Sequence, residues 1–306
     1  MEERLSKPNA PAVGTLIVTW NRRRDLLECV ESVLRSTYPS LTVYVVDNAS
    51  TDSSSCAIRQ EFPGVRIIRS PENLGFSGGN NLGLALMISD GIEAAFLIND
   101  DLIVEEDTIE KLVSNGFHDP KVGILAPKVL LHSQPGVIWS AGGTVDPVSG
   151  VAAQRHCGET DAGQAEVPIE VDYAIGCAML VKTEAIRRTG LIDPRYFMYY
   201  EEADWCRRMA QAGYKVLYVP QSRVRHKVTL SNNGRNHAPY YFSRNRLLYL
   251  ETGGAGPARI AWVAFSDILR SAAVHAIKGR ADRSRLMLKG VADYYLRNFG
   301  RMGSGA

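Results

Sequence analysis

The chain has 306 residues, a hydrophobic content of 45% and a formal net charge of +2. A chain of this length can bury a large core, and its near-neutral charge gives no reason to expect a nucleic acid partner. Its five cysteines are scattered, with no C-x-x-C pair, which argues against a disulfide framework or a structural zinc site and favours a reducing compartment. Residues 1–12 are polar and lack the apolar core of a signal peptide. The sequence has no run of about eighteen or more uncharged apolar residues, which argues against a membrane span.

Short apolar runs alternate with helical patterns through the first half of the chain. This alternation is typical of an α/β protein with a mostly parallel sheet flanked by helices. The apolar runs predict strands at 13–19, 42–46, 65–69, 94–98 and 122–126, and apolar residues at helical spacing predict helices at about 22–36, 77–89 and 108–115.

The second half is less regular. Residues 137–167 are rich in Gly, Ala and polar residues, which indicates hairpins or a mobile loop. The remaining predicted elements are a strand at 173–181, helices at about 183–188 and 201–211, and a strand at 215–219 closed by Pro220. From residue 237 onward the sequence is mostly helical and basic, with breaks at 253–257 and near 279. We therefore expect a flexible N-terminus (1–12), a catalytic domain (13–236) and a helical C-terminal region (237–306). The catalytic domain would consist of two halves, at about 13–130 and about 131–236.

The most informative segment is the strand 94–98, which runs directly into Asn99, Asp100 and Asp101. Ligands bind open α/β sheets at the carboxyl ends of the strands. Carboxylate and amide oxygens there suit a hard divalent cation, which usually shares its coordination with substrate phosphates. An acidic turn after a strand is the simpler interpretation of these residues. The residues that follow the neighbouring strands distinguish such a turn from a cation site.

Two other strands also end in polar residues. The first is followed by Thr19-Trp20-Asn21-Arg22, and the second by a segment from Asp47 to Asp52. Asn21, Ser50 or Asp52 could also serve only as helix N-caps. A glycine-rich segment at 73–81, N-L-G-F-S-G-G-N-N, follows the third strand. Glycines there let backbone amides approach a ligand, and the helix start favours anions.

The ordered combination of these segments resembles the family 2 glycosyltransferases with the GT-A fold, a Rossmann-like architecture. V-T-W-N-R, V-V-D-N-A-S-T-D, N-L-G-F-S-G-G-N-N and L-I-N-D-D occur in that order. The later segment at 197–204, F-M-Y-Y-E-E-A-D, is similar to the F-x-Y-x-E-D-x-D motif of the rhamnosyltransferase-like branch, and 241–246, Y-F-S-R-N-R, is also similar to that branch. The resemblance covers about residues 13–250.

The resemblance implies inverting transfer of a sugar, rhamnose or a hexose, from a dTDP- or UDP-linked donor to a hydroxyl of a glycan, a lipid-linked molecule or a small molecule. Asp47 would bind the base, and Asp101 would ligate Mg²⁺ or Mn²⁺, with His226 as a second ligand. Asn99 stands where the family has the first acid of its D-x-D motif. The other residues implied in nucleotide-sugar binding are Thr19, Trp20, Asn21, Arg22, Asn48, Asn73, Gly75, Phe76, Gly78 and Asp100.

A general base must remove the proton of the acceptor hydroxyl, a step worth roughly 10²–10⁴-fold in rate. Glu202 fills the position of the family's catalytic Asp, one methylene longer, and Glu201 and Asp204 are the alternatives. Residues 201 and 204 share a helix face that 202 does not. Acids in a first helical turn can also simply complement the helix dipole.

The C-terminal helices interleave basic residues with apolar ones such as Trp262, Phe265 and Ile277. Core packing is the favoured interpretation, while contact with an anionic membrane or a second subunit stays open. We expect a cytoplasmic protein, with peripheral contact at the inner face of the membrane as an open alternative. The competing functions are a nucleotidyltransferase and a catalytically inactive nucleotide-sugar binding module. A processive synthase is disfavoured because the sequence has no Q-x-x-R-W motif.

Overall fold

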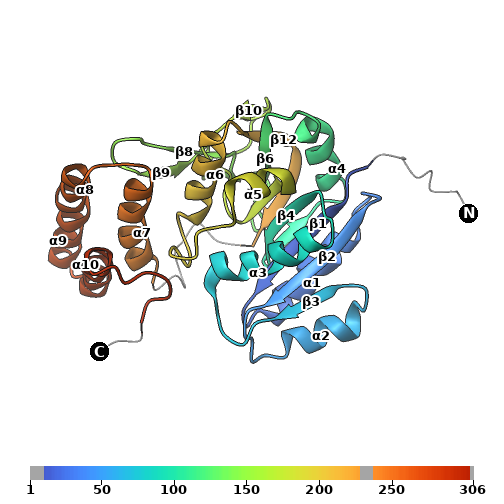
Figure 1. The fold of residues 1–306 in the computed structure, drawn as a ribbon, viewed down its shortest axis with the longest axis horizontal. Helices are drawn as coiled ribbons and strands as arrows, with labels where there is room; N and C mark the ends of the chain where they lie inside the picture. The colour runs from blue at the N-terminus through green and yellow to red at the C-terminus, as the bar shows by residue number, and fades with distance from the viewer. Residues whose placement is uncertain (1–9, 228–236, 304–306) are drawn as a thin grey trace, which may run out of the picture.

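The computed structural model describes residues 10–227 and 237–303. Figure 1 shows a large sheet with helices on both sides and a group of helices at the C-terminal end of the molecule. Of the N-terminal segment expected to be flexible, residues 1–9 lie outside the described residues. The fold is α/β with a mostly parallel central sheet, as the sequence predicted.

The predicted parallel strands form one half of the sheet. β1 (Val13–Thr19) lies between β2 (Leu41–Asp47) and β4 (Ala94–Asn99), and β3 (Arg66–Arg69) extends the sheet beyond β2. All of these pairings are parallel. The register aligns Thr19 with Asp47 and Val18 with Asn99, so the polar residues after the three strands meet at one edge.

Alternate residues of these strands pack into two separate cores. Leu16, Val46 and Leu97 face one core, which α3 (Gly75–Ser89), α5 (Thr183–Thr189) and α6 (Glu201–Gln211) cover. Their neighbours Ile17, Val45 and Phe96 face the other. That second core is covered by α1 (Arg23–Leu34), α2 (Ser54–Glu61) and α4 (Thr108–Leu112), the last continuing as the π-helix η1 (Val113–Phe117). Burial on both faces explains the continuous apolar strands.

The second half of the sheet differs from the prediction in its bounds. The strand predicted at 173–181 is β11 (Ala178–Lys182), which runs antiparallel between β4 and β6 (Val122–Leu131). The strand predicted to stop at Pro220 continues as β12 (Lys215–His226), because a register irregularity between Val219 and Arg223 accommodates the proline. The sequence analysis did not identify α2 or the short strand β5 (Leu102–Val104), which pairs with β12.

The irregular segment from 137 to 170 contains short strands. β7 (Ile138–Ser140) pairs with β6, and β8 (Gly143–Val145) forms a hairpin with β9 (Ala152–Gln154). β10 (Ile169–Glu170) pairs with β12 at the edge of the sheet. The hairpin alternative of the prediction is therefore confirmed for β8 and β9.

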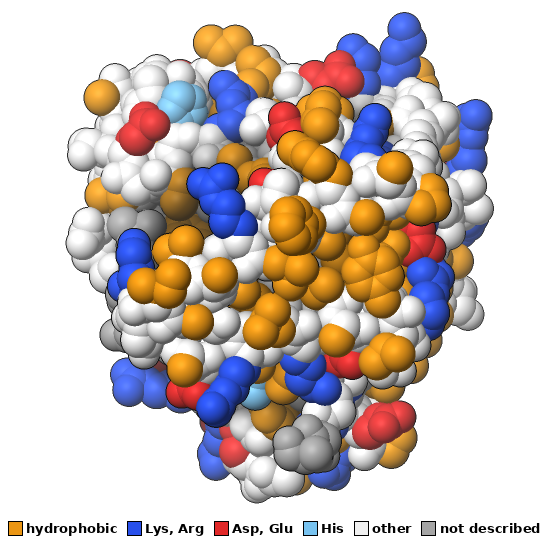
Figure 2. All heavy atoms as spheres, turned by 90° about the vertical axis from the view of Figure 1, so that its left-hand side faces the viewer, with side chains coloured by type: hydrophobic (Ala, Val, Ile, Leu, Met, Phe, Trp, Pro, Cys, Tyr) orange, Lys and Arg blue, Asp and Glu red, His pale blue; other side chains and the backbone are white. Residues whose placement is uncertain are grey.

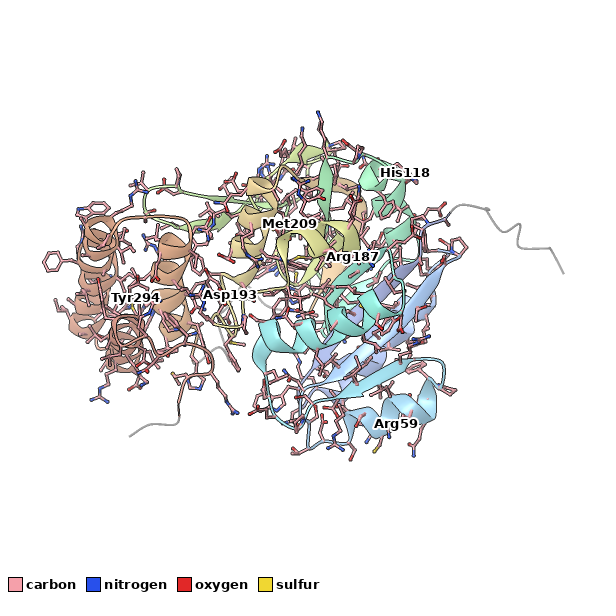
Figure 3. The ribbon with its side chains drawn as sticks, viewed as in Figure 1. Arg59, His118, Arg187, Asp193, Met209 and Tyr294 are labelled. Carbon is pink, nitrogen blue, oxygen red and sulfur yellow. The ribbon has the colours of Figure 1, made fainter. Side chains whose placement is uncertain are left out.

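The C-terminal helices are α7 (Ala238–Thr252), α8 (Pro257–Val263), the π-helix η2 (Ala264–Leu269), α9 (Arg270–Ile277) and α10 (Ala281–Tyr295). In Figure 1, α7 lies between α6 and the outer helices. Tyr294, labelled among these helices in Figure 3, donates a hydrogen bond of 2.7 Å to Glu251 of α7. The predicted breaks at 253–257 and near 279 are confirmed.

One helix among the described residues, Pro257–Ile277, is long and apolar enough to cross a membrane by length and composition. Its best window has a mean hydropathy of 1.3. The sequence analysis excluded a span because it required a run without any charge, whereas this helix contains Arg259, Asp267 and Arg270. Length and composition alone are weak evidence for a membrane span.

Candidate active site

A cavity of about 810 Å³ lies at the carboxyl ends of β1, β2 and β4. It receives Thr19 and Trp20 from the end of β1 and Asn99 and Asp100 from the end of β4. Other residues of the predicted set that line it are Asn48, Asn73, Gly75 and Phe76. The structure thus brings most of the predicted nucleotide-sugar residues together at the switch point of the sheet, where such ligands bind in open α/β folds.

Asn48 and Asn73 shape the glycine-rich loop. Asn48 donates from Nδ2 to Asn73 Oδ1 (3.1 Å) and to the Gly75 carbonyl (3.0 Å), and its Oδ1 accepts from the Leu74 amide at 2.8 Å. Asn73 Oδ1 also accepts from the Gly75 amide. These side chains therefore fix the wall of the cavity through its backbone.

The start of α3 does not offer free amides to an anion, contrary to the prediction. The Phe76 and Ser77 amides both donate to the carbonyl of Phe197. Gly75 is required there because a Cβ would lie 2.5 Å from that carbonyl oxygen and because its φ is +71°. Gly78, which the resemblance implied in nucleotide-sugar binding, is inside α3 and accommodates the Leu74 side chain instead.

Asp47 is buried at the end of β2. Its Oδ1 accepts from the Ser50 amide at 2.8 Å, while its Oδ2 has no hydrogen-bond partner among the described residues. Arg69 Nε lies 3.8 Å from that second oxygen, too far for a hydrogen bond. A buried carboxylate oxygen without a donor is costly, so it is ready to accept from a ligand N–H.

Asn21 and Asp52 connect the loops after β1 and β2. The Asn21 side chain accepts from the Thr51 amide at 2.7 Å, and its own amide donates to Ser50 Oγ. Asp52 accepts from the Arg23 amide at the start of α1 and from the Ser54 amide at the start of α2. The helix-start interpretation therefore fits Asp52, and Asn21 does not line the cavity.

The two aspartates after β4 have different environments. Asp100 Oδ2 accepts from Thr19 Oγ1 at 2.7 Å, and burial raises the pKa of Asp100 to about 7. Asp101 is also buried, which opposes ionisation, but its hydrogen bond with His226 Nε2 (3.0 Å) and the nearby Arg22 charge lower its pKa to about 2. Arg22 Nη1 donates to Asp101 Oδ2 at 3.1 Å. Arg22, predicted to contact the nucleotide sugar, is thus paired with an aspartate of the site.

Asp101 and His226 can supply two ligands to a divalent cation. Among the residues that the structure describes, no group of three or more His, Cys, Asp or Glu side chains could hold an ion by itself. Mg²⁺, however, is commonly held by one or two protein ligands with substrate phosphates completing its shell. His226 Nε2 faces Asp101, so a cation held by both side chains would replace their mutual hydrogen bond. Arg22 already balances the acids with positive charge. The residues present fit a cation that binds together with a diphosphate.

The three candidate carboxylates at the start of α6 are not equivalent. Asp204 is saturated, since Arg207 and Arg208 donate to its two oxygens at 2.5 Å and 2.9 Å. Glu201 and Glu202 each have one buried carboxylate oxygen without a partner among the described residues. Burial raises the pKa of both, and for Glu201 the neighbouring Glu202 charge adds to the rise. These contacts favour a structural role for Asp204.

Glu202 lies beside the cavity wall. A Cβ placed on Gly176 would lie 3.2 Å from the Phe76 ring and 3.7 Å from the Glu202 carboxyl carbon. Phe76 lines the cavity, so Gly176 leaves the space that lets Glu202 sit next to that wall. The Gly176 and Ala203 amides also favour the ionised form and limit the rise in the pKa of Glu202.

The loop before α6 has an unusual backbone. Phe197, Tyr199 and Tyr200 all have positive φ, at 65°, 69° and 73°. Each such residue costs of order 1–3 kcal/mol and persists only if its surroundings fix it. Asn245 of α7 does so by donating from Nδ2 to the carbonyls of Tyr196, Met198 and Tyr199 at 2.8–2.9 Å.

Arg244 supports the same loop from a fully buried position. Its guanidinium donates to the carbonyls of Arg195 and Tyr196 and, on its other side, to the Gly300 carbonyl at 2.7 Å. The Arg244 guanidinium is therefore engaged by backbone carbonyls rather than open to a ligand. Arg246 is likewise occupied, by Asp267 at 2.6 Å.

Several residues that line the cavity were not predicted. Phe197 and Met198 belong to the F-x-Y-x-E segment, and Tyr241 to the Y-F-S-R-N-R segment, so their motifs could have indicated them. Arg301 and Met302 reach the cavity from the C-terminal segment, where the Met302 amide donates to Tyr241 Oη at 2.9 Å. Nothing in the local sequence at 301–303 signals this role.

Polar loops at the switch point, two aspartates after β4 and a glutamate beside the same cavity fit an α/β enzyme that binds a nucleotide-linked substrate. Residues 15–190 match the model of glycosyl transferase family 2, and the chain belongs to that family. It is a glycosyltransferase with the GT-A fold, which removes the nucleotidyltransferase alternative.

Relatives and solved structures agree with this assignment. The N-acetylglucosaminyl-diphospho-decaprenol L-rhamnosyltransferase of Mycobacterium tuberculosis is 27% identical over 76% of this chain and 81% of its own length. The dTDP-rhamnosyl transferase RfbF of Shigella flexneri is 21% identical over 78% and 79%. The mannosyltransferase PcManGT from Pyrobaculum calidifontis, solved with GDP-Man and Mn²⁺, superimposes with a TM-score of 0.60 at 14% identity over 95% of this chain and 89% of that one.

Proposed function

We propose that this glycosyltransferase moves a sugar from a nucleotide diphosphate donor to a hydroxyl acceptor with inversion at the anomeric carbon. The observation that carries the proposal is the position of Glu202, which follows the buried Glu201 and lies beside Phe76 of a cavity that Asp100 also lines. A carboxylate on one side and a diphosphate site on the other suit attack on the face opposite the leaving group.

In this proposal the residues at the strand ends hold the nucleotide. Asp47 Oδ2, which lacks a partner among the described residues, accepts an N–H from the base. Asn48 and Asn73 hold the loop that forms the wall beside it. Asp101 and His226 would hold a divalent cation, Mg²⁺ or Mn²⁺, which neutralises the charge that develops on the departing diphosphate. Arg22, which forms an ion pair with Asp101, supplies further positive charge at this edge of the sheet.

Glu202 is the proposed general base. It takes the proton of the acceptor hydroxyl while the acceptor oxygen forms a bond to the anomeric carbon. The bond from that carbon to the phosphate oxygen breaks, and the nucleoside diphosphate leaves with the electron pair. A raised pKa suits a base that works near neutral pH, because the group is a stronger proton acceptor when ionised. Only the ionised form accepts a proton, so turnover should rise with pH through the titration of the Glu201–Glu202 pair.

Rhamnose from dTDP-rhamnose is the first donor to test, because two relatives bear names that specify rhamnosyl transfer. A thermal-shift panel of dTDP-, UDP- and GDP-sugars, each with Mn²⁺ and with EDTA, identifies the donor by the stabilisation that a saturating ligand gives. A turnover assay with that donor and simple or lipid-linked acceptors follows. Donor binding without any transfer or hydrolysis would support an inactive nucleotide-sugar binding module instead.

A further inference from the structure

The helix formed by α8, η2 and α9 is apolar on two sides. One side, with Ile260, Val263 and Ile268, is buried against the rest of the protein. The other side is exposed, although the sequence analysis favoured core packing for it. Trp262, Phe265 and Ile277 on that side are 54%, 75% and 85% exposed. A surface helix normally presents a polar face to water, so an apolar exposed face needs a partner.

The apolar residues on this side recur at helical spacing. Trp262, Phe265, Leu269, Ala273 and Ile277 follow one another at intervals of three or four residues, and all are exposed or partly exposed. Figure 2 looks onto this end of the molecule and shows hydrophobic side chains gathered across its middle, with Lys and Arg side chains around them. We call the residues Trp262, Phe265 and Ile277 the outer apolar face.

Unpaired positive charges lie next to this face. The turn from α9 to α10 carries Lys278, Arg280 and Arg283, all exposed and without a salt bridge to any described residue. Asp282, the one acid within this turn, lies 3.9 Å from Arg285. Burial and then the three cations lower the pKa of His275, which places these charges close to that side chain. The turn therefore presents positive charge directly beside the outer apolar face.

We propose that the outer apolar face and the Lys278–Arg283 turn dock this glycosyltransferase on an anionic membrane surface. Apolar side chains inserted at the level of the lipid headgroups and cations beside them are the two features of an interfacial helix. The helix lies on the membrane and does not span it, because its other side is packed in the protein core. Each basic residue near an anionic surface contributes the equivalent of about a fivefold gain in affinity.

A second copy of the chain fits the surface less well. Most dimers are two-fold symmetric and place the same patch of both subunits against each other. A dimer through the outer apolar face would bring two sets of Lys278, Arg280 and Arg283 together, with only Asp282 in the turn to oppose their repulsion. An anionic bilayer satisfies the apolar area and the charges at once.

The test is co-sedimentation of the full chain with vesicles of phosphatidylcholine alone or with about one third phosphatidylglycerol. We expect binding to the anionic vesicles that weakens as salt is added. The triple variant Lys278→Gln, Arg280→Gln, Arg283→Gln should bind on the order of 100-fold more weakly. The matched control Arg59→Gln, Lys121→Gln, Arg187→Gln removes the same charge elsewhere and should bind like wild type; Figure 3 labels Arg59 and Arg187 away from the C-terminal helices.

The apolar part is tested by Phe265→Ser with Ile277→Ser, against the control Leu34→Ser with Val167→Ser, all of them exposed positions. Only the first pair should lose binding. Tryptophan fluorescence should locate the contact. Brominated lipids should quench the emission of Trp262 in the wild-type protein and should not quench the emission of the Trp262→Phe variant. Equal binding by all variants, or binding to neutral vesicles alone, overturns the proposal. So does a dimer in light scattering that Phe265→Ser with Ile277→Ser converts to monomer. None of these readouts depends on catalysis.

Discussion

Replacing Asn245 by Ala should damage both the stability of the protein and its catalysis. Asn245 is completely buried, and its amide nitrogen donates to three carbonyls of the loop that leads into α6. Its Oδ1 accepts from Arg244 Nε at 2.9 Å, which orients the amide. The substitution leaves the three carbonyls without this donor while the backbone at Phe197, Tyr199 and Tyr200 stays in a disfavoured region.

The hydrogen bonds set the size of the effect. The amide has two hydrogens for its three carbonyls, so we count two donated hydrogen bonds and the one that Oδ1 accepts from Arg244. At about 1 kcal/mol net for each, the variant loses about 3 kcal/mol. If the whole amount appears as lost folding stability, the melting temperature falls by roughly 5–10 °C for a chain of this size. If part of it appears as a displaced loop, turnover falls by roughly 10- to 100-fold, because each 1.4 kcal/mol is a factor of ten.

Steady-state kinetics and thermal melting of the same preparations separate these effects. Because Phe197 and Met198 line the cavity and Glu202 follows them closely, we expect a higher donor KM together with a lower kcat. Asn115→Ala is the control, since its amide donates to the Lys111 carbonyl on the exposed α4 end. A lower melting temperature with unchanged kcat and KM would show that Asn245 is structural only. Wild-type values for all three would refute the reasoning.

Three further predictions concern the acids. Asp47→Ala should weaken nucleotide affinity with or without metal, and calorimetry showing unchanged affinity would rule out its role in binding the base. Asp101→Asn should lower turnover and raise the Mn²⁺ concentration required, whereas full activity in excess EDTA would contradict a metal-assisted step. Glu201→Gln should raise the melting temperature at pH 8 but hardly at pH 4.5. The pKa of Glu201 is raised in the folded state, so wild-type stability falls as pH rises above the unfolded value of 4.5; equal melting temperatures at pH 8 would contradict this.

Local patterns predicted the strands and helices that carry a clear apolar periodicity. The strand at 13–19 and the helix at 201–211 have the predicted bounds, because apolar runs and amphipathic periodicity are local signals. The predicted end of the strand at Pro220 is wrong, because the irregularity that accommodates the proline lies in the pairing of β12 with β6. The short β5 is similarly defined by its pairing with β12 rather than by its own sequence.

Motifs placed the candidate site but did not predict the ionisation of its acids. Burial raises the pKa of Asp100, whereas the hydrogen bond with His226 and the Arg22 charge lower that of Asp101 although it is also buried. The sequence left Asp204 as an alternative base, whereas the structure pairs it with Arg207 and Arg208. Such contacts join segments far apart in the chain, so no local pattern encodes them. Arg301 reaches the cavity for the same reason.

The most direct test of the central claim compares Glu202→Gln with Glu201→Gln, using the donor found in the thermal-shift panel. The amide keeps the shape of the side chain and removes its basicity. Glu202→Gln should therefore bind the donor almost as wild type does while turnover falls by roughly 10²-fold or more. Glu201→Gln should retain the larger part of its turnover. Near-wild-type turnover in Glu202→Gln, with turnover abolished and donor affinity preserved in Glu201→Gln or Asp204→Asn, would show that another carboxylate is the base.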